Sequence, residues 1–459
     1  MRAKYLLYIL FILSFFYIIA IGGSGCAQIG APTGGKKDTI SPKFIDASPA
    51  DRATNVTTNK ITLDFDEYVE VLDAFNNVLV SPYPKNSPSV NYKFRTITIR
   101  LKDTLLPNTT YTINFGNAIR DVNEANILKN FSYTFSTGNV IDSLSVEGKV
   151  VIAETGRVDS TLMVMLYRNG VDSSVQTRRP DYMAKVSGNG SFYFDHLPAG
   201  NYRIYALKDG DGSKTYNAKK ELFAFLDKDL VVSKLNDPVD LYAYAEDKIM
   251  PTITPDKDKK LKYTSSIGDR QDLLNDVELY FNKPLKKIDT AIAILTDTNY
   301  KRLPYTISID SNRKNISLHT KWIEDADYRL IVNKDAFADT GGLVLTKSDT
   351  IRFHTRKEAD YGNLVLRFTK LDLKQHPVLQ FVQGDEVKQS VPLSSAEWNQ
   401  KLFRPGEYEM RILFDTNNNG RWDPGNYSLK RQPERVIVIP QKLVVRPGWD
   451  NEKDINLNL

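Results

Sequence analysis

Short runs in which hydrophobic and polar residues alternate follow one another along most of the chain. Clear examples lie at 61–65, 96–101, 111–115 and 131–135, and Val, Ile, Thr, Tyr and Phe dominate them. Successive side chains of a strand point to opposite faces, so this alternation predicts strands with one buried and one solvated face. Pro, Gly, Asn and Asp separate the runs, and long helical patterns are few. The pattern predicts an all-β protein.

One unit of this pattern occurs twice, at residues 60–137 and 276–355. Each copy has an early strand ending in phenylalanine, a long hairpin whose return strand begins at Tyr111 or Tyr328, and a closing aromatic strand followed by threonine. The shared order and spacing predict two copies of one domain, which we name A1 and A2.

A second unit follows each copy, at residues 191–216 and 400–422. Its centre is a Gly-x-Tyr segment that begins at Gly200 or Gly406, and an aspartate lies nine residues after each glycine. The two copies, B1 and B2, therefore stay in register through an acidic loop. We predict four β-sandwiches in the order A-B-A-B, each of about 100 residues, which is a common size for this architecture. The predicted segments are a signal peptide at 1–25, a flexible tether at 26–41, A1 at 42–138, B1 at 142–247, A2 at 260–356 and B2 at 360–459.

The first 25 residues have the pattern of an export signal. Arg2 and Lys4 precede an apolar run at 6–21, and small residues follow it. This order predicts a secretory signal peptide. A retained transmembrane anchor is the alternative, although a helix of this length spans about 24 Å and the hydrocarbon core is about 30 Å thick.

Cys26 is the only cysteine among 459 residues, which excludes an intramolecular disulfide and a cysteine-cluster metal site. The segment Gly23-Ser24-Gly25-Cys26 resembles a bacterial lipobox, in which the cysteine becomes the first residue and its thiol carries a diacylglycerol. The resemblance implies a lipid anchor at Cys26, because several acyl chains hold a protein on a membrane. A free thiol beside an ordinary cleavage site is the alternative.

Charge and motif content narrow the classes of function. The chain has 61 Lys and Arg against 56 Asp and Glu, with no basic block, which argues against a nucleic-acid partner. H-E-x-x-H, G-x-S-x-G and C-x-x-C are absent, and only four histidines occur. We therefore predict that the protein is not an enzyme. A hydrolase with a site at a domain junction is an alternative, since paired carboxylates can meet in space without a sequence motif.

The sharpest chemical motif lies in B2. Asp415, Asn417 and Asn419 follow the D-x-[DN]-x-[DN]-G spacing of a calcium loop, with Gly420 at the sharp turn and Asp423 as a further oxygen ligand. The spacing makes these four oxygen-bearing side chains candidate Ca²⁺ ligands. A turn that binds nothing uses the same residue types and is the alternative.

The equivalent segment of B1 is a second candidate for Ca²⁺. Asp209, Asp211 and Ser213 provide oxygens at the same spacing, but Lys214 stands where the motif has glycine. An ordinary turn is again the alternative.

Aromatic residues in B2 are a candidate surface for sugars or peptides. Trp398, Trp422 and Trp449 all lie there, with Tyr427 nearby. The alternative is that these rings fill the core of a small domain.

Both types of unit resemble known families. The segments at 61–65, 106–111 and 131–137 of A1 resemble the SbsA-type bacterial Ig-like domain of surface-layer proteins. The F-x-F-x-x-L-P-x-G-x-Y segment of B1, at 192–202, resembles the transthyretin or carboxypeptidase-regulatory-like sandwich. The P-T-G-G and K-D-T segments that follow Cys26 resemble exported lipoproteins of Bacteroidetes-type bacteria. The resemblances imply tandem sandwiches and an exported location.

Together these features predict a non-enzymatic, lipid-anchored protein of the cell envelope, held at the outer membrane, that serves as a structural or interaction scaffold. Its expected partners are the membrane, through the lipid, and an envelope protein or glycan. A carbohydrate-binding surface lipoprotein is the first alternative and the hydrolase is the second.

Overall fold

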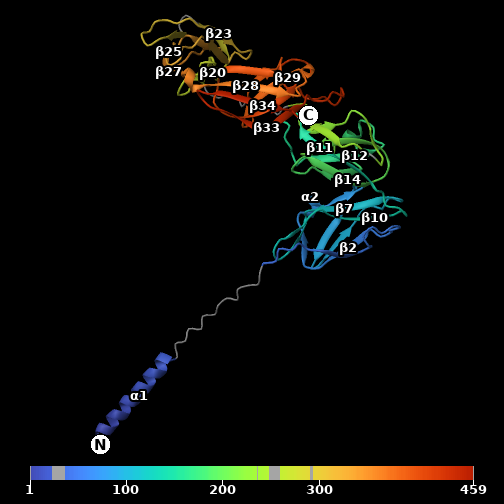
Figure 1. Ribbon diagram of the computed structural model, residues 1–459. Helices are drawn as coiled ribbons and strands as arrows, with labels where there is room; N and C mark the ends of the chain where they lie inside the picture. Colours follow the sequence, from blue (N-terminus) through green and yellow to red (C-terminus); the bar gives the residue numbers. More distant parts are fainter. Residues whose placement is uncertain (1, 23–36, 235, 248–258, 290–292, 458–459) are drawn as a thin grey trace. The chain divides into compact units, whose positions relative to one another are not determined.

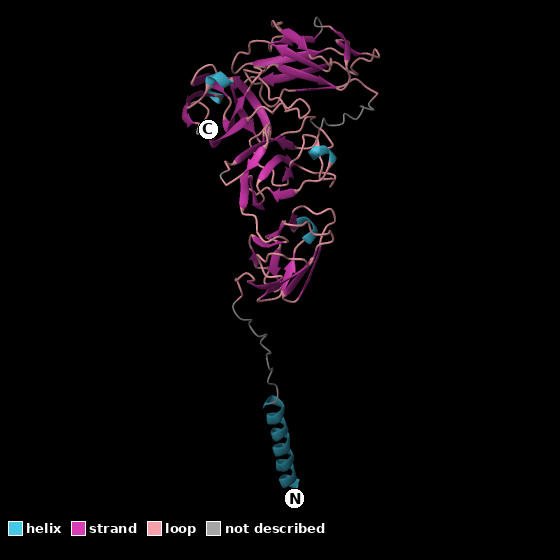
Figure 2. Ribbon diagram, turned by 90° about the vertical axis from the view of Figure 1, so that its right-hand side faces the viewer, coloured by secondary structure: helices cyan, strands magenta, loops and turns pink. Residues whose placement is uncertain are grey.

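The computed structural model describes residues 2–22, 37–234, 236–247, 259–289 and 293–457. Strands are its main regular structure and helices are short and few apart from the N-terminal one (Figure 2), which confirms the predicted all-β class. Helix α1 (Arg2–Gly22) covers the predicted signal segment (Figure 1), whereas Cys26 and most of the predicted tether lie outside the described residues. None of the described helices combines the length and the apolar character needed to cross a membrane.

The chain divides into two compact units. The first comprises Met1–Val78, Lys85–Leu106 and Ile113–Phe135, and the second comprises Leu79–Pro84, Pro107–Thr112 and Ser136–Leu459. Most of A1 belongs to the first unit, and B1, A2 and B2 belong to the second.

A1 is built of three sheets, with strand orders β1-β2-β6-β5, β10-β7-β4 and β3-β8-β9. The predicted alternation places Ile61 and Leu63 of β2 opposite Ile99 and Ile97 of β6, and all four side chains are fully buried. The elements are β1 (Phe44–Ser48), β2 (Lys60–Phe65), β3 (Val69–Val71), α2 (Ala74–Asn77), β4 (Leu79–Ser81), β5 (Ser89–Lys93), β6 (Thr96–Arg100), β7 (Thr110–Gly116), β8 (Ile119–Asp121), β9 (Ile127–Leu128) and β10 (Phe131–Ser136).

A2 has corresponding sheets, with orders β19-β20-β24-β23, β22-β25-β27 and β21-β26. Each strand takes the place of one strand of A1 in chain order, with no equivalent of β9 among the described residues. The strands are β19 (Tyr263–Ser265), β20 (Val277–Phe281), β21 (Leu285–Ile288), β22 (Ala293–Thr296), β23 (Thr306–Ile309), β24 (Asn315–His319), β25 (Asp327–Val332), β26 (Phe337–Asp339) and β27 (Asp349–His354).

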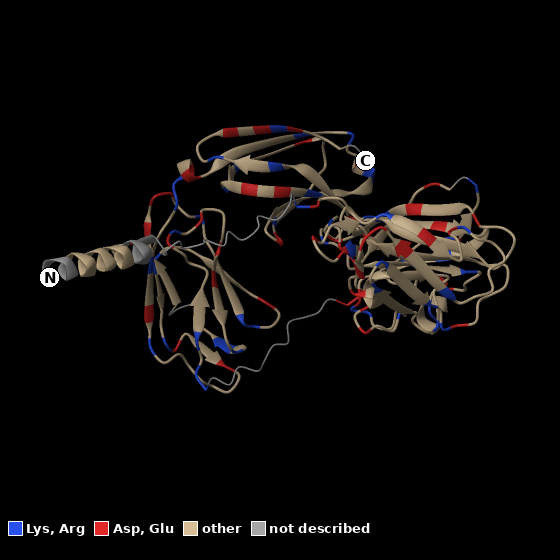
Figure 3. Ribbon diagram, turned by 90° about the horizontal axis from the view of Figure 1, so that it is seen from below, with Lys and Arg blue, Asp and Glu red and all other residues tan. Residues whose placement is uncertain are grey.

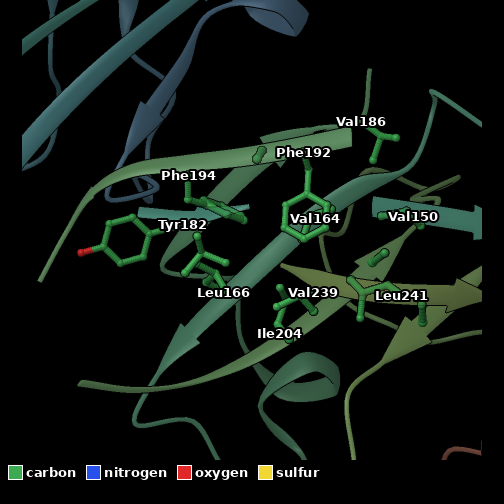
Figure 4. Packing of buried hydrophobic residues seen from close by; sticks show 14 of the residues in the cluster. Val150, Val164, Leu166, Tyr182, Val186, Phe192, Phe194, Ile204, Val239 and Leu241 are labelled. Atoms are coloured by element: carbon green, nitrogen blue, oxygen red, sulfur yellow. The ribbon is translucent and has the colours of Figure 1, made fainter. Parts of the chain in front are cut away.

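B1 contains the sheets β14-β11-β18 and β13-β12-β15-β16, with β17 also paired to β15. Valine, leucine and phenylalanine side chains from both sheets fill its core (Figure 4). The elements are β11 (Leu144–Ile152), β12 (Met163–Arg168), α3 (Ser174–Thr177), β13 (Tyr182–Lys185), β14 (Ser191–Leu197), β15 (Gly200–Leu207), β16 (Phe223–Phe225), β17 (Leu230–Val232) and β18 (Val239–Ala243).

B2 contains the sheets β31-β28-β34 and β30-β29-β32-β33. In B1 and in B2 the last strand runs parallel to the first, β18 beside β11 and β34 beside β28. The elements are η1 (Glu358–Asp360), β28 (Gly362–Thr369), η2 (Leu373–Gln375), β29 (Pro377–Gln383), β30 (Glu386–Pro392), β31 (Glu397–Phe403), β32 (Gly406–Phe414), β33 (Val436–Val445) and β34 (Asp450–Asn456).

The Gly-x-Tyr segments have one structural role in both copies. Gly200 and Gly406 have φ values of 154° and 150°, which favour glycine. The Tyr202 hydroxyl donates to the carbonyl of Pro198 at 2.9 Å, and the Tyr408 hydroxyl donates to the carbonyl of Arg404 at 3.0 Å. The tyrosine therefore fastens the turn before its own strand, as tyrosine corners do in sandwiches.

Within the second unit, B1 and B2 contact each other directly although A2 lies between them in the sequence. Tyr427 of B2 is buried in an aromatic cluster of B1 that includes Phe223 and Phe225, with ring centroids 5.0 and 5.1 Å away. Its hydroxyl lies 3.0 Å from that of Tyr205, and its backbone N–H donates to the Glu246 carboxylate at 3.0 Å. The order of the units along the chain did not predict this contact.

Candidate functional site

The candidate calcium motifs lie in two equivalent loops. The B1 loop (209–217) follows β15, and the B2 loop (415–423) follows β32. Both loops pass through the left-handed region at the same two places, Gly212 and Lys214 in B1 and Asn418 and Gly420 in B2. Strand β16 is the next strand after the B1 loop, and β33 is the next strand after the B2 loop.

The B2 loop wraps its backbone around Asp415. This side chain is almost fully buried, at 1% exposure. Its Oδ2 accepts the N–H of Gly420 at 2.6 Å, and its Oδ1 accepts the N–H of Asn419 at 3.2 Å. Gly420 has a φ of 77° and no atom near its missing Cβ, so the turn, and not crowding, favours glycine here.

The structure brings the four predicted ligand residues of B2 together. Asn417 and Asn419 each donate an Nδ2–H to Oδ2 of Asp423 at 2.6 Å. Asp415 anchors the same turn from the other side through the backbone of Asn419. One loop therefore gathers two carboxylates and two amides, residue types whose oxygens Ca²⁺ prefers. The amides turn their Nδ2 atoms to Asp423, and their Oδ1 atoms accept the N–H groups of Asn419 and Arg421.

Glu434 supports the B2 loop and was missed by the sequence reasoning. Its carboxylate is 5% exposed and accepts the N–H of Thr416 at 2.7 Å, the Thr416 hydroxyl at 2.8 Å and the N–H of Asp423 at 3.0 Å. Glu434 lies just before β33, well beyond the motif, so spacing within the loop carried no signal for it.

The B1 loop contains a closer group of carboxylates. Oxygens of Asp209, Asp211 and Glu221 all lie within 4.8 Å of one another. Glu221 was also missed, because the sequence motif ends before it. The Lys214 ammonium lies 2.6 Å from Oδ2 of Asp209, at the place in the turn that Gly420 occupies in B2. This loop therefore holds a cation from its own chain.

Each loop contains one equivalent hydrogen bond between an asparagine amide and an aspartate, with the two residue types at opposite positions. In B1 the Asn217 amide donates to Oδ2 of Asp211 at 2.7 Å, and in B2 the Asn417 amide donates to Asp423 at 2.6 Å. The acid and the amide have changed places. The Asn217 hydrogen bond is the main reason why the pKa of Asp211 lies below its usual range.

The oxygen donors of the B2 loop fit a calcium ion better than those of B1. Among the described residues, Asp209 has an ion pair with a lysine, whereas no basic side chain forms an ion pair with Asp415. Asp415, Asn417, Asn419 and Asp423 are the residues that would hold the ion. Bound Ca²⁺ would supply the positive charge that Lys214 supplies in B1.

The histidines lie in or beside strands. His196 is the penultimate residue of β14, with a φ of 53°. His354 bonds to Asp327 and Asp325, and these hydrogen bonds, that to Asp327 first, raise the pKa of the imidazole. His376 follows η2 and is exposed.

His319 lies between a serine and an aspartate. Its Nε2 is 2.7 Å from the Ser308 hydroxyl, and its Nδ1 is 2.6 Å from Oδ2 of Asp276. The three residues come from β23, the end of β24 and the segment before β20, so they are not adjacent in sequence. This is the hydrogen-bond order of a serine hydrolase, and no sequence motif pointed to it.

The tryptophans of B2 have different surroundings. Trp398 packs against Phe381 in the core, and Trp422 donates its indole N–H to the Glu434 carbonyl at 2.7 Å. Trp449 is 59% exposed beside Arg446. Only Trp449 therefore retains the open ring that the predicted sugar platform requires.

Comparison with known proteins identifies one domain. Residues 38–137 match the family described as Bacterial Ig-like domain, which confirms the Ig-like assignment of A1. A search of curated proteins found no match.

Solved structures give weaker likenesses. The N-terminal part of the bacterial S-layer protein SbsC is 15% identical over 45% of this chain, with a TM-score of 0.17, and this chain covers 44% of it. The Bacillus anthracis TIE protein is 10% identical over 94% of this chain and 75% of its own, with a TM-score of 0.17. The major pilin subunit BcpA of Bacillus cereus is 9% identical over 68% of this chain and 99% of its own, with a TM-score of 0.16. At these TM-scores the likenesses carry no argument about function.

Proposed function

We propose that the chain is an exported, lipid-anchored scaffold of the cell envelope without catalytic activity of its own. The observation that carries the proposal is the duplication of two sandwich types, with an Ig-like match in A1 and with aromatic side chains used to join B1 to B2. Repeated sandwiches supply edge strands and loops for contacts with partners. Acidic and basic residues are interspersed along the ribbon (Figure 3), which favours a protein or glycan partner over nucleic acid.

The anchor is tested at one residue. Cells producing the full-length chain are fractionated, and the intact mass of the mature protein is measured. A processed chain that begins at Cys26 and carries the mass of a diacylglycerol and a fatty acid is expected in the membrane fraction. Cys26→Ser should be released from that fraction, with Ser24→Ala as a matched change nearby. A Cys26→Ser chain that is still processed and membrane-bound contradicts the anchor.

The partner is sought in the same membranes. Cross-linking followed by purification of the lipidated chain should recover one envelope component at a constant ratio. Recovery of this component should fall when domain A1 or domain B2 is deleted. It should not change when small-molecule substrates are added. A partner whose bonds are altered by the purified protein would contradict a purely structural role.

For the B2 loop we infer Ca²⁺ as a structural ion, held by Asp415, Asn417, Asn419 and Asp423. The support is the buried Asp415 carboxylate and the convergence of two amides on Asp423. Binding to the folded state alone would stabilise the protein.

A second candidate function is an acyl hydrolase in A2, favoured by the line of hydrogen bonds from Ser308 through His319 to Asp276. Strand β23 is at the edge of its sheet, so it presents backbone N–H groups to an incoming oxygen. The Ser308 oxygen would bond to an ester carbonyl carbon while its proton passes to His319. The leaving alcohol would take that proton, and water would then cleave the acyl-serine.

A fluorophosphonate probe separates the two candidates. The hydrolase requires labelling at Ser308, which Ser308→Ala abolishes and Ser317→Ala on the neighbouring strand preserves. The scaffold proposal expects no labelling in any of these proteins, so labelling of Ser308 would contradict it.

A further inference from the structure

An exposed pair of aromatic rings stands on A1. Tyr68 precedes β3 and is 49% exposed, and Phe94 lies between β5 and β6 and is 64% exposed. Their ring centroids are 5.6 Å apart with an interplanar angle of 41°. Contiguous exposed apolar rings, unlike single ones, mark interaction sites on folded proteins.

The turn that carries Phe94 is held by the sheet. Phe94 has a φ of 56°, which is unusual for a bulky residue. Its carbonyl accepts the N–H of Val69 at 2.9 Å, and the carbonyl of Arg95 accepts the N–H of Phe65 at 2.9 Å. The backbone therefore fixes the direction of the ring and reduces the entropy that a ligand must remove.

A2 shows that the fold does not require these rings. In its equivalent turn Arg313 has a φ of 55°, and its carbonyl accepts the N–H of Leu285 at 2.8 Å. The Arg313 guanidinium turns back and donates to the carbonyl of Leu285 at 2.6 Å. Pro284 stands at the position that corresponds to Tyr68. The same turn is thus built without an aromatic pair, and the pair in A1 needs another explanation.

Two cations flank the rings. The Lys93 ammonium lies 5.4 Å from the centre of the Phe94 ring, and the Arg95 guanidinium lies 5.9 Å from that of Tyr68. Among the described residues neither cation takes part in an ion pair. Both remain available to an anion.

The rings and cations border one hollow of about 590 Å³, and Thr96 and Thr98 of β6 complete its lining. The Thr96 hydroxyl donates to Asp64 at 2.5 Å, which leaves its oxygen open as an acceptor. The hollow therefore combines aromatic faces, hydroxyl groups and positive charge.

We propose that this hollow binds an acidic saccharide, a glycan that contains uronic acid. Aromatic faces cover the C–H faces of sugar rings, threonine oxygens reach their hydroxyls, and Lys93 and Arg95 pair with the carboxylate. The unpaired cations favour an acidic sugar over a neutral one. The proposal does not depend on the calcium loop or on the anchor.

The test measures binding of a defined oligogalacturonate to the purified full-length chain by calorimetry. The same oligosaccharide with methyl-esterified carboxyl groups is the neutral probe. We expect binding of the acidic form and at least about tenfold weaker binding of the ester, since the ester removes the charge that faces Lys93 and Arg95. Equal binding of the two forms, or no binding of either, overturns the proposal.

Variants locate the site. Phe94→Asn keeps a residue that tolerates positive φ, and it should weaken binding of the acidic form about tenfold or more. Phe75→Ala, in the exposed helix α2 of the same domain, should leave binding unchanged. Equal affinities of Phe94→Asn and the unaltered chain, at unchanged melting temperature, would place any binding elsewhere and overturn the assignment. Vesicles with anionic headgroups are a third probe, and Phe94-dependent binding to vesicles without binding to the saccharide would identify a membrane contact instead.

Discussion

The B1 and B2 loops follow equivalent strands and turn through the left-handed region at equivalent residues. At one of these residues B1 has Lys214, whose ammonium contacts the Asp209 carboxylate. B2 has Gly420 there, which donates only its backbone N–H to Asp415. The same backbone therefore surrounds a cation of its own chain in B1, whereas in B2 no basic side chain of the described residues forms an ion pair with Asp415. The difference teaches that the identity of a single turn residue sets the charge of an acidic loop.

The loops also lead to different neighbours. Within the B1 loop, Tyr216 stacks on Phe223 of B1 with the ring centroids 4.1 Å apart. The B2 loop continues to Tyr427, which leaves B2 and enters the same aromatic cluster. A tyrosine of the B1 loop and a tyrosine that follows the B2 loop thus meet on one ring, Phe223, and Tyr427 joins the two sandwiches.

Removing the joining ring should have the largest effect. Tyr427→Ala takes a buried ring out of the cluster and removes the hydroxyl next to Tyr205, so the B1–B2 contact should lose about 3–5 kcal/mol. Chemical unfolding of the full chain should then change from a shared transition of B1 and B2 to separate ones. Tyr193→Ala, an exposed tyrosine of B1, is the control. An unchanged transition for Tyr427→Ala would mean that the contact does not couple the two sandwiches.

Calcium should distinguish the loops next. At a concentration of about 100 times the Kd, Ca²⁺ should stabilise the full chain by about 2.7 kcal/mol through the B2 loop. Gly420→Lys copies the B1 loop into B2 and should remove the response, because the new ammonium would occupy the place of the ion. Space for the side chain is available, since no atom lies within 4 Å of the added Cβ.

Calorimetry in Ca²⁺ and in EDTA measures this effect. Mg²⁺ at the same concentration is the ionic control, because the loop resembles sites suited to the larger ion. A melting temperature that is identical in Ca²⁺ and EDTA for the unaltered chain would show that the B2 loop is only a turn.

The reverse change should have a smaller effect. Lys214→Gly removes the ammonium from Asp209 and leaves three carboxylates within 4.8 Å, so B1 should gain a response to Ca²⁺. The stabilisation of this variant by Ca²⁺ should be smaller than that through the B2 loop, since B1 has Ser213 and not an amide at the position of Asn419. Lys220→Gly, on the same segment outside the turn, should not create a response. Ca²⁺-dependent melting that is the same in both variants would contradict the role assigned to Lys214.

Titration of Asp211 should give the smallest effect. Its folded pKa lies below the usual value of about 3.9, so its contribution to stability is complete above that value and is lost as the pH falls toward the folded pKa. Asn217→Ala should raise the folded pKa and move this loss to higher pH. NMR titration of the carboxyl carbon measures the change, and Asp372, whose pKa is lowered by the Lys374 N–H, is an internal reference. A pKa of Asp211 that does not rise in the variant would rule out this hydrogen bond as the cause.

Sequence patterns were sufficient for features that depend on neighbours in the chain. Alternation predicted the positions of β2, β6, β7 and β10, because one face of each strand must be buried. The predicted solvated face was wrong for β7 and β10, where Thr112 and Thr134 are buried as well. The motif at Asp415 predicted which side chains share one turn, because a turn joins residues a few positions apart. The lipid anchor at Cys26 remains a prediction of the same local kind.

Only the tertiary structure decided which distant segments meet. Glu434, just before β33, binds the backbone of the B2 loop. Tyr427 packs in the aromatic cluster of B1, although A2 lies between B1 and B2 in the sequence. His319 contacts Asp276 because β24 pairs with β20. The sequence determined the strands, the repeats and the acidic turns, since these follow from local spacing. Packing and strand register determined the contacts between them. Burial of apolar surface is favourable for any complementary pair of surfaces, whatever the number of residues between them in the sequence.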